Sequence, residues 1–145
     1  MRPATLLLVH ALLTAAALEA RDPNEPRERP AACEIVEIRS DHGAGSGSRF
    51  SATKIVELRF ETALEGRPRP ERRLRLRLTT PGGFLYQVLS VPVDPNPTKR
   101  RLVARLPVAG TSIMASGLYG RWTVTPVLGD GSEACGPSRR FVINP

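Results

Sequence analysis

Two cysteines, Cys33 and Cys135, have the clearest chemistry in this chain, because both follow a segment with the features of a secretory leader. Export takes a protein out of the reducing cytosol, where thiols otherwise remain free. Two cysteines in an exported chain are expected to pair with each other, and a reactive or intermolecular thiol is the alternative. We predict one Cys33–Cys135 disulfide, which makes the residues between them a single structural unit.

The predicted leader, a signal peptide, comprises residues 1–20. Arg2 supplies its positive charge and residues 6–18 form a mainly apolar stretch. Either Ala15-Ala16-Ala17 or Leu18-Glu19-Ala20 could present the small residues that a signal peptidase requires, which places cleavage between Ala17 and Ala20. An uncleaved membrane anchor is the alternative, but the apolar stretch is shorter than the roughly 20 residues that span a bilayer. No later segment is apolar enough to do so. We therefore expect a secreted or periplasmic protein.

The mature sequence contains no recognisable catalytic or metal-binding signature. Once the leader is removed, His42 is the only histidine. It lies in Ser40-Asp41-His42-Gly43, where a Gly- and Ser-rich loop lacks the fixed geometry of a nucleophile and its base. One histidine and two oxidised cysteines do not provide zinc ligands at the usual spacing. We predict a protein that is not an enzyme and that uses no cofactor or metal.

Arginine is the second notable feature of the composition. The formal net charge is +7, and all but Lys54 and Lys99 of the 21 basic residues are arginine. One explanation is the codon usage of a GC-rich genome. The other is a preference for acidic partners, because a positive field attracts anions.

The segment 72–79 concentrates this charge on one side of a predicted strand. Strict alternation places leucines on one face and arginines on the other (Leu74, Leu76, Leu78; Arg73, Arg75, Arg77). Three guanidinium groups about 6 to 7 Å apart could bind phosphates, carboxylates or sulfates. The alternative is a solvated face whose arginines pair with Glu57, Glu61 or Glu71. An anionic component of the cell envelope is favoured over nucleic acid, because export removes nucleic acid and exposed aromatic residues are few.

Seven segments have strand patterns, and turn signals separate them: 33–39, 54–61, 72–79, 84–93, 101–108, 118–128 and 140–143. The pattern of segment 54–61 buries Val56, Leu58 and Phe60, and that of 118–128 buries Trp122. Segment 84–93 is apolar on both faces, which predicts coverage on both sides, and Pro92 marks an edge or an end. No window has a convincing helical period. The sequence therefore predicts an all-β fold, an immunoglobulin-like antiparallel sandwich of about seven strands.

The chain divides into three parts on this interpretation. Residues 21–32 contain three prolines and alternating charges, which predicts a disordered linker after the leader. The domain then comprises residues 33–145, with a flexible Gly/Ser loop at 40–48. The disulfide would join the first strand to the segment before the last, instead of crossing the centre of the sandwich.

The run SGLYGRWTVTPVL at residues 116–128, followed by Asp130-Gly131 and a closing strand at 140–143, resembles the penultimate-strand signature of immunoglobulin-like modules in exported bacterial proteins. Macroglobulin-type modules have a similar glycine–aromatic–tryptophan run. The resemblance covers about 30 residues. It implies a module that binds, spaces or scaffolds, with no catalytic residues to carry over.

Two functions follow from these observations. The first is a secreted or periplasmic, non-enzymatic binding module that acts through surface contacts, with an anionic envelope component as the candidate partner and Arg73, Arg75 and Arg77 as the candidate site. The second is a structural or spacer subunit of an envelope complex, joined by edge-strand pairing through the first or the final strand.

Overall fold

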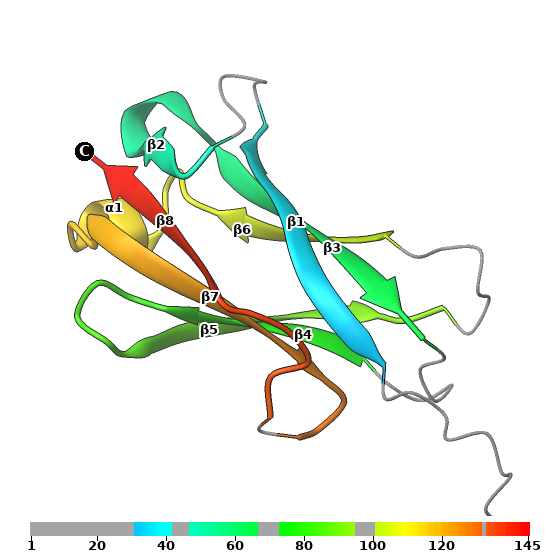
Figure 1. Cartoon of the computed structure of the whole chain (residues 1–145). Coiled ribbons are helices and arrows are strands. Elements are labelled where there is room, and N and C mark those ends of the chain that lie inside the picture. The colour runs from blue at the N-terminus through cyan, green and yellow to red at the C-terminus, as the bar shows by residue number, and fades with distance from the viewer. Residues whose placement is uncertain (1–30, 42–46, 67–72, 95–100, 132) are drawn as a thin grey trace, which may run out of the picture.

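Strands account for most of the computed structural model, which describes residues 31–41, 47–66, 73–94, 101–131 and 133–145 (Figure 1). The described strands form two sheets that pack face to face. The predicted leader, most of the predicted linker, His42 and Glu71 lie outside the described residues. None of the helices in the described ranges is long and apolar enough to cross a membrane.

The smaller sheet has three antiparallel strands in the order β1-β3-β6: β1 (Ala32–Ser40), β3 (Glu57–Glu65) and β6 (Arg101–Pro107). β1 begins at Ala32, which pairs with Glu65 of β3 and is the last residue of the predicted linker. The register of β1 against β3 shifts between Ile35 and Glu37, which marks an irregularity in this edge strand.

The larger sheet has five strands in the order β2-β8-β7-β4-β5: β2 (Arg49–Ser51), β4 (Arg73–Thr79), β5 (Leu85–Pro92), β7 (Gly120–Leu128) and β8 (Arg139–Asn144). Four of its strands are antiparallel to their neighbours, as expected. The predicted all-β sandwich is confirmed, and the short strand β2 at one edge differs from the rest in running parallel to its neighbour β8. A strand of three residues has too little pattern to be recognised in the sequence.

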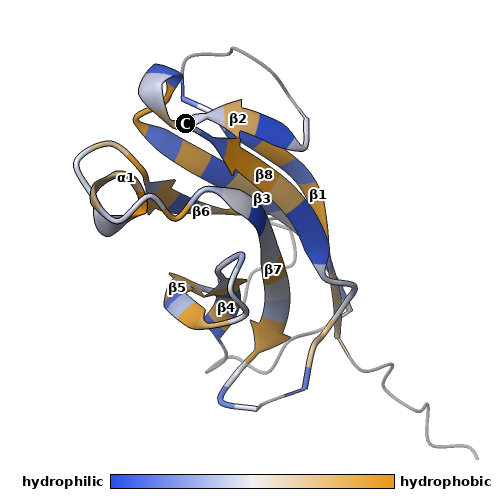
Figure 2. Ribbon diagram, turned by 90° about the vertical axis from the view of Figure 1, so that its left-hand side faces the viewer, coloured by the Kyte–Doolittle hydropathy of each residue, from blue (hydrophilic) through white to orange (hydrophobic). Residues whose placement is uncertain are grey.

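Apolar and polar residues alternate along the strands, as Figure 2 shows. The apolar side chains of both sheets point inward and fill the space between the sheets. Leu74, Leu76 and Leu78 are buried, as are Trp122 and Phe60. The Trp122 ring stacks on Phe141 and meets Tyr86 edge to face, and its indole N–H donates to the carbonyl oxygen of Leu118 at 2.9 Å. Trp122 is therefore a core residue, as predicted.

Two expectations about burial are wrong. Val56 is 53% exposed because a 3₁₀ turn, η1 (Ala52–Lys54), precedes β3, which starts at Glu57 and not at Lys54. Segment 84–93 is covered on one face only, because the smaller sheet packs against the inner face of the larger sheet, and Val88 on the outer side of β5 is 40% exposed. The edge position expected for Pro92 is confirmed.

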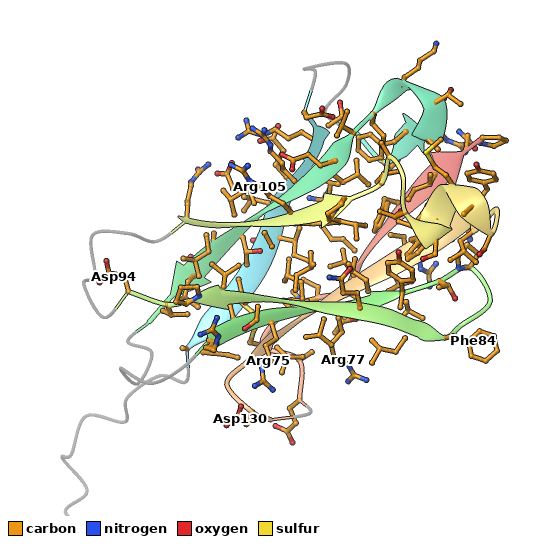
Figure 3. The ribbon with its side chains drawn as sticks, turned by 180° about the vertical axis from the view of Figure 1, so that it is seen from behind. Arg75, Arg77, Phe84, Asp94, Arg105 and Asp130 are labelled. Carbon is orange, nitrogen blue, oxygen red and sulfur yellow. A yellow bond between two sulfur atoms is a disulfide. The ribbon has the colours of Figure 1, made fainter. Side chains whose placement is uncertain are left out.

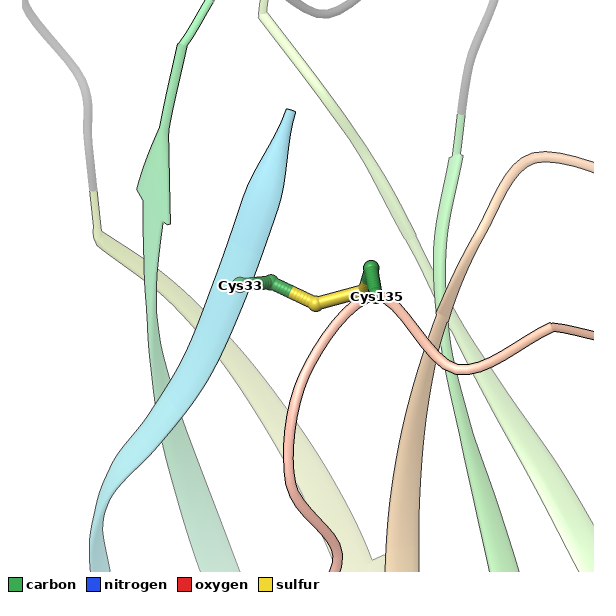
Figure 4. Close-up of a disulfide and its surroundings, with 2 residues drawn as sticks. All are labelled: Cys33 and Cys135. Atoms are coloured by element: carbon green, nitrogen blue, oxygen red, sulfur yellow. A yellow bond between two sulfur atoms is a disulfide. The ribbon is translucent and has the colours of Figure 1, made fainter. Parts of the chain in front are cut away.

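The predicted disulfide is present between Cys33 in β1 and Cys135 in the loop between β7 and β8 (Figure 4). The Cα atoms are 5.3 Å apart, and the Cys33 amide donates to the Cys135 carbonyl oxygen at 2.9 Å. The Cys135 amide donates in turn to the carbonyl oxygen of Pro126 in β7. This corner therefore links the two sheets covalently near the start of β1.

A short helix, α1 (Ser112–Ala115), closes one end of the sandwich between β6 and β7 (Figure 1). Thr111 caps it by accepting from the Ile113 amide, and Ile113 is fully buried. The Ser112 hydroxyl lies 2.9 Å from the Tyr86 hydroxyl of β5, so α1 also contacts the larger sheet. Four residues are too few to produce a helical period in the sequence.

Candidate anion-binding face

The charged residues of the described strands are divided unequally between the two sheets. The three strands of the smaller sheet contain glutamates and arginines in similar numbers (Glu34, Glu37, Glu57, Glu61, Glu65; Arg39, Arg59, Arg101, Arg105). The five strands of the larger sheet contain arginines and no Asp or Glu (Arg49, Arg73, Arg75, Arg77, Arg121, Arg139, Arg140). The outer face of the larger sheet is therefore the basic side of the domain.

Arginines of the smaller sheet are neutralised within that sheet. Glu57 accepts from Arg59 at 2.8 Å and lies 3.7 Å from Arg105, because β3 stands between β1 and β6. Arg101 pairs with Glu61 on the same strand pair. Exposed pairs of this kind contribute little to stability, but they leave the outer surface of this sheet close to neutral.

The arginines predicted as a site, Arg73, Arg75 and Arg77, all point away from the core on β4. Figure 3 shows Arg75 and Arg77 side by side on the outer face, whereas Arg105 lies on the opposite side of the sandwich. Two of the three have partners from neighbouring segments. Arg73 donates to the Ser90 hydroxyl of β5 at 2.7 Å, and Arg75 pairs with Asp130 at 2.7 Å.

Two of the three glutamates considered as partners for this ladder lie too far from it. Glu57 and Glu61 belong to β3, in the other sheet, and so cannot reach the outer face of β4. Glu71 lies outside the described residues. Arg77 has no hydrogen bond or ion pair within the described part of the chain, so it is the member of the predicted ladder that is open to a ligand.

Register places three further arginines on the same outer face as Arg77. Arg121 of β7 and Arg49 of β2 lie on either side of Val142, and Arg140 of β8 lies opposite Thr123. None of these arginines has a hydrogen bond or ion pair among the described residues. We define this set, Arg49, Arg77, Arg121 and Arg140, as the arginine face.

Threonine hydroxyl groups occupy two positions of the outer face next to these arginines, and Val142 separates Arg49 from Arg121. Thr123 lies between Arg140 and Thr79, and Thr125 lies beside Arg77. Strands about 4.8 Å apart and alternate residues about 6.6 Å apart separate the Cα atoms of neighbouring members of the face by about 8 to 12 Å. One phosphate or sulfate is smaller than this spacing. The geometry therefore suits several anionic groups held on a polymer or a surface.

Exposed apolar side chains border the arginine face at the β4–β5 hairpin. Phe84 and Leu85, which follow the turn at residues 80–83, are 75% and 54% exposed, and we call this pair the hairpin tip. Leu85 lies opposite Thr79 in the register and Val88 lies opposite Arg77. Figure 3 shows Phe84 at the far end of the hairpin, away from the core.

Sequence reasoning identified Arg77 but missed Arg49, Arg121 and Arg140. Their common face depends on which strands are neighbours, and no local pattern contains that information. In the described ranges, no group of three or more His, Cys, Asp or Glu side chains is arranged to hold a metal ion. Comparisons of the chain with family models, with curated proteins and with solved structures found no match.

Proposed function

We propose that this protein is an extracytoplasmic, non-enzymatic binding module that recognises an anionic component of the cell envelope through the arginine face. One observation carries the proposal: five strands of one sheet contain seven arginines and no acidic residue (Arg49, Arg73, Arg75, Arg77, Arg121, Arg139, Arg140). The disulfide supports placement outside the cytosol, where such bonds persist.

Binding by this face requires little rearrangement. Because the four arginines have no partner among the described residues, a ligand has no ion pair to break. Guanidinium groups bind phosphate, sulfate and carboxylate through paired hydrogen bonds, and charge-assisted hydrogen bonds are stronger than neutral ones. The arginines are about one Debye length or more apart, roughly 8 Å at physiological salt, so their mutual repulsion is largely screened and each is available to a separate anionic group.

An immunoglobulin-like topology is part of the same proposal. If β1 and β2 are counted as two halves of one first strand, the chain order gives the sheets A-B-E and A-G-F-C-C′. This order is close to the strand sets of immunoglobulin domains, in which A, B and E share one sheet and C, F and G share the other. Modules of this architecture act mainly through their surfaces, although the fold alone does not determine the function.

A matched pair of triple variants tests the arginine face. Arg77→Gln/Arg121→Gln/Arg140→Gln removes three charges from the larger sheet, and Arg39→Gln/Arg59→Gln/Arg105→Gln removes three from the smaller. Binding to heparin, a polyanion probe, is measured by titration at several salt concentrations. We expect the first variant to lose at least about tenfold in affinity and to show a flatter salt dependence, because its contacts are electrostatic. Equal losses in both variants would show that only the net charge matters, and would refute the proposal.

The second candidate function is that of a structural or spacer subunit, which would join its complex by edge-strand pairing. Of the described strands, β5 suits such pairing better than the first or the final strand. The final strand β8 is excluded because β2 and β7 pair with it on both sides. The first strand β1 is irregular, and Arg139 donates to its Ile35 and Val36 carbonyl oxygens. By contrast, β5 is an edge strand without any charged residue.

Charged residues normally protect edge strands from pairing with other chains, and β5 lacks this protection. Its edge lines a groove of about 380 Å³ with residues 103–105 of β6. Val88→Lys on β5 and Val103→Lys on β6 place a lysine on either side of that groove. If β5 pairs with a second chain, Val88→Lys alone should release a monomer in sedimentation equilibrium. A parent protein that is already monomeric at high concentration would count against self-pairing.

A further inference from the structure

We propose that the anionic component is a lipid surface, which the arginine face contacts through headgroup phosphates while the hairpin tip enters the interface between headgroups and acyl chains. The inference rests on the proposed function, because it uses the same arginines. It adds Phe84 and Leu85, which recognition of a soluble polyanion does not require.

The hairpin tip and the unpaired arginines occupy the same end of the outer face. Thr79 pairs with Leu85 on one side and with Thr123 on the other, and Thr123 pairs with Arg140. Leu85 and Arg140 therefore lie in one row that crosses four strands. The arginines that already have described partners, Arg73 and Arg75, lie toward the opposite end of β4. A flat anionic surface at the hairpin end would meet the unpaired arginines and the apolar tip together.

The turn presents Phe84 on a defined structure. The Thr80 amide donates to the Phe84 carbonyl oxygen and the Gly83 amide to the Thr80 carbonyl oxygen, both at 2.9 Å. The Thr80 hydroxyl also accepts from the Phe84 amide at 3.2 Å. Pro81 packs against Gly120 at the start of β7 so closely that a Cβ atom there would lie 3.2 Å from the proline ring. The hairpin is thus fixed beside Arg121.

The exposed side chains of the hairpin tip, Phe84 and Leu85, contribute nothing to the packing of the described core. The core beneath β4 and β7 is filled by Leu78, Trp122 and Val124, which are fully buried without any contribution from Phe84. A sulfated or phosphorylated polymer in water offers little apolar surface to a phenylalanine. A bilayer offers both, since interfacial binding combines buried apolar area with attraction to anionic headgroups.

The test compares two ligands for the same variants. Vesicles of mixed phosphatidylglycerol and phosphatidylcholine report lipid binding by sedimentation, and heparin reports binding to a soluble polyanion. Phe84→Ser/Leu85→Ser should lose at least about tenfold in vesicle affinity and keep its heparin affinity, because its arginines are intact. Arg77→Gln/Arg121→Gln/Arg140→Gln should lose both. Both changes are at exposed positions, and unfolding curves identical to the parent's verify the fold.

A tryptophan reporter locates the contact directly. Trp122, the only tryptophan of the chain, is fully buried, so vesicles should leave its emission unchanged. In Phe84→Trp, we expect a blue shift and quenching by brominated lipids on addition of anionic vesicles. Val103→Trp, at an exposed position on the smaller sheet, is the control and should show neither.

The outcomes separate this inference from the function on which it rests. Parent protein that binds heparin but not anionic vesicles would overturn the lipid inference and leave the proposed function standing. Vesicle binding that survives Phe84→Ser/Leu85→Ser would overturn insertion of the tip. A dimer that this variant dissociates would show that a second copy, not lipid, covers the tip. Parent protein that binds neither ligand would refute the proposed function itself.

Discussion

Replacing both Cys33 and Cys135 with alanine should lower the free energy of unfolding by about 4 to 5 kcal/mol. The bond closes a loop with a sequence separation of 102 residues, for which the chain-entropy relation gives about 4.7 kcal/mol at 25 °C. Domains of this size are stable by about 5 to 15 kcal/mol, so the loss is a large share of the total. We still expect the double variant to form the native strands. The core consists mainly of apolar side chains from both sheets, and Cys33 is the one buried cysteine among them.

Urea denaturation followed by far-UV circular dichroism measures this loss. With a slope of about 2 kcal/mol per molar urea, the midpoint should fall by about 2 M. The slope should also increase, because an unfolded chain without the cross-link exposes more surface. The parent protein in reducing agent is the matched control and should behave like the double variant. A decrease below about 1 kcal/mol, with an unchanged slope, would refute the loop-entropy reasoning.

Three smaller changes test individual contacts through the same denaturation assay. Thr62→Val should stabilise the domain by about 1 kcal/mol, since the Thr62 hydroxyl is buried without a partner among the described residues; lower stability would reveal a partner. Gly136→Ala should cost about 2 to 3 kcal/mol and slow disulfide formation, because its Cβ would collide with the Cys33 carbonyl group. Arg139→Gln should cost about 1 to 3 kcal/mol and speed hydrogen exchange in β1, whose carbonyl oxygens it bonds, whereas the exposed Arg140→Gln should do neither.

Sequence reasoning predicted best where the pattern is local. Alternation in β4 and β7 correctly identified the buried faces, because a period of two residues depends only on the strand itself. It failed for β2 and α1, which are too short to have a period. It also failed for β5, where coverage of a face depends on which elements lie above it. Pro92 indicated an edge, but the apolar residues around it suggested burial.

The disulfide and the outward direction of the predicted ladder also followed from the sequence, while its partners did not. Asp130 and Ser90 approach β4 only after β7 and β5 have paired with it. For the same reason, Arg121 and Arg140 look in the sequence like isolated exposed residues. Their common face is a property of strand order, which residue spacing does not encode. Whether Arg77 binds an anion is a prediction that the variants above test, and anion binding by Arg73 and Arg75 also stays a prediction.

The unequal division of charge also distinguishes a role in binding from a role in stability. Arginines of the smaller sheet have internal counter-charges, so removing them leaves unpaired glutamates and changes the surface potential of that sheet. The arginine face has none among the described residues, and the spacing of about 8 to 12 Å between its members leaves their mutual repulsion largely screened. Glutamine at these positions should therefore leave the free energy of unfolding unchanged or slightly higher. Unchanged stability together with weaker heparin binding in the same variant would assign these charges to binding and not to folding.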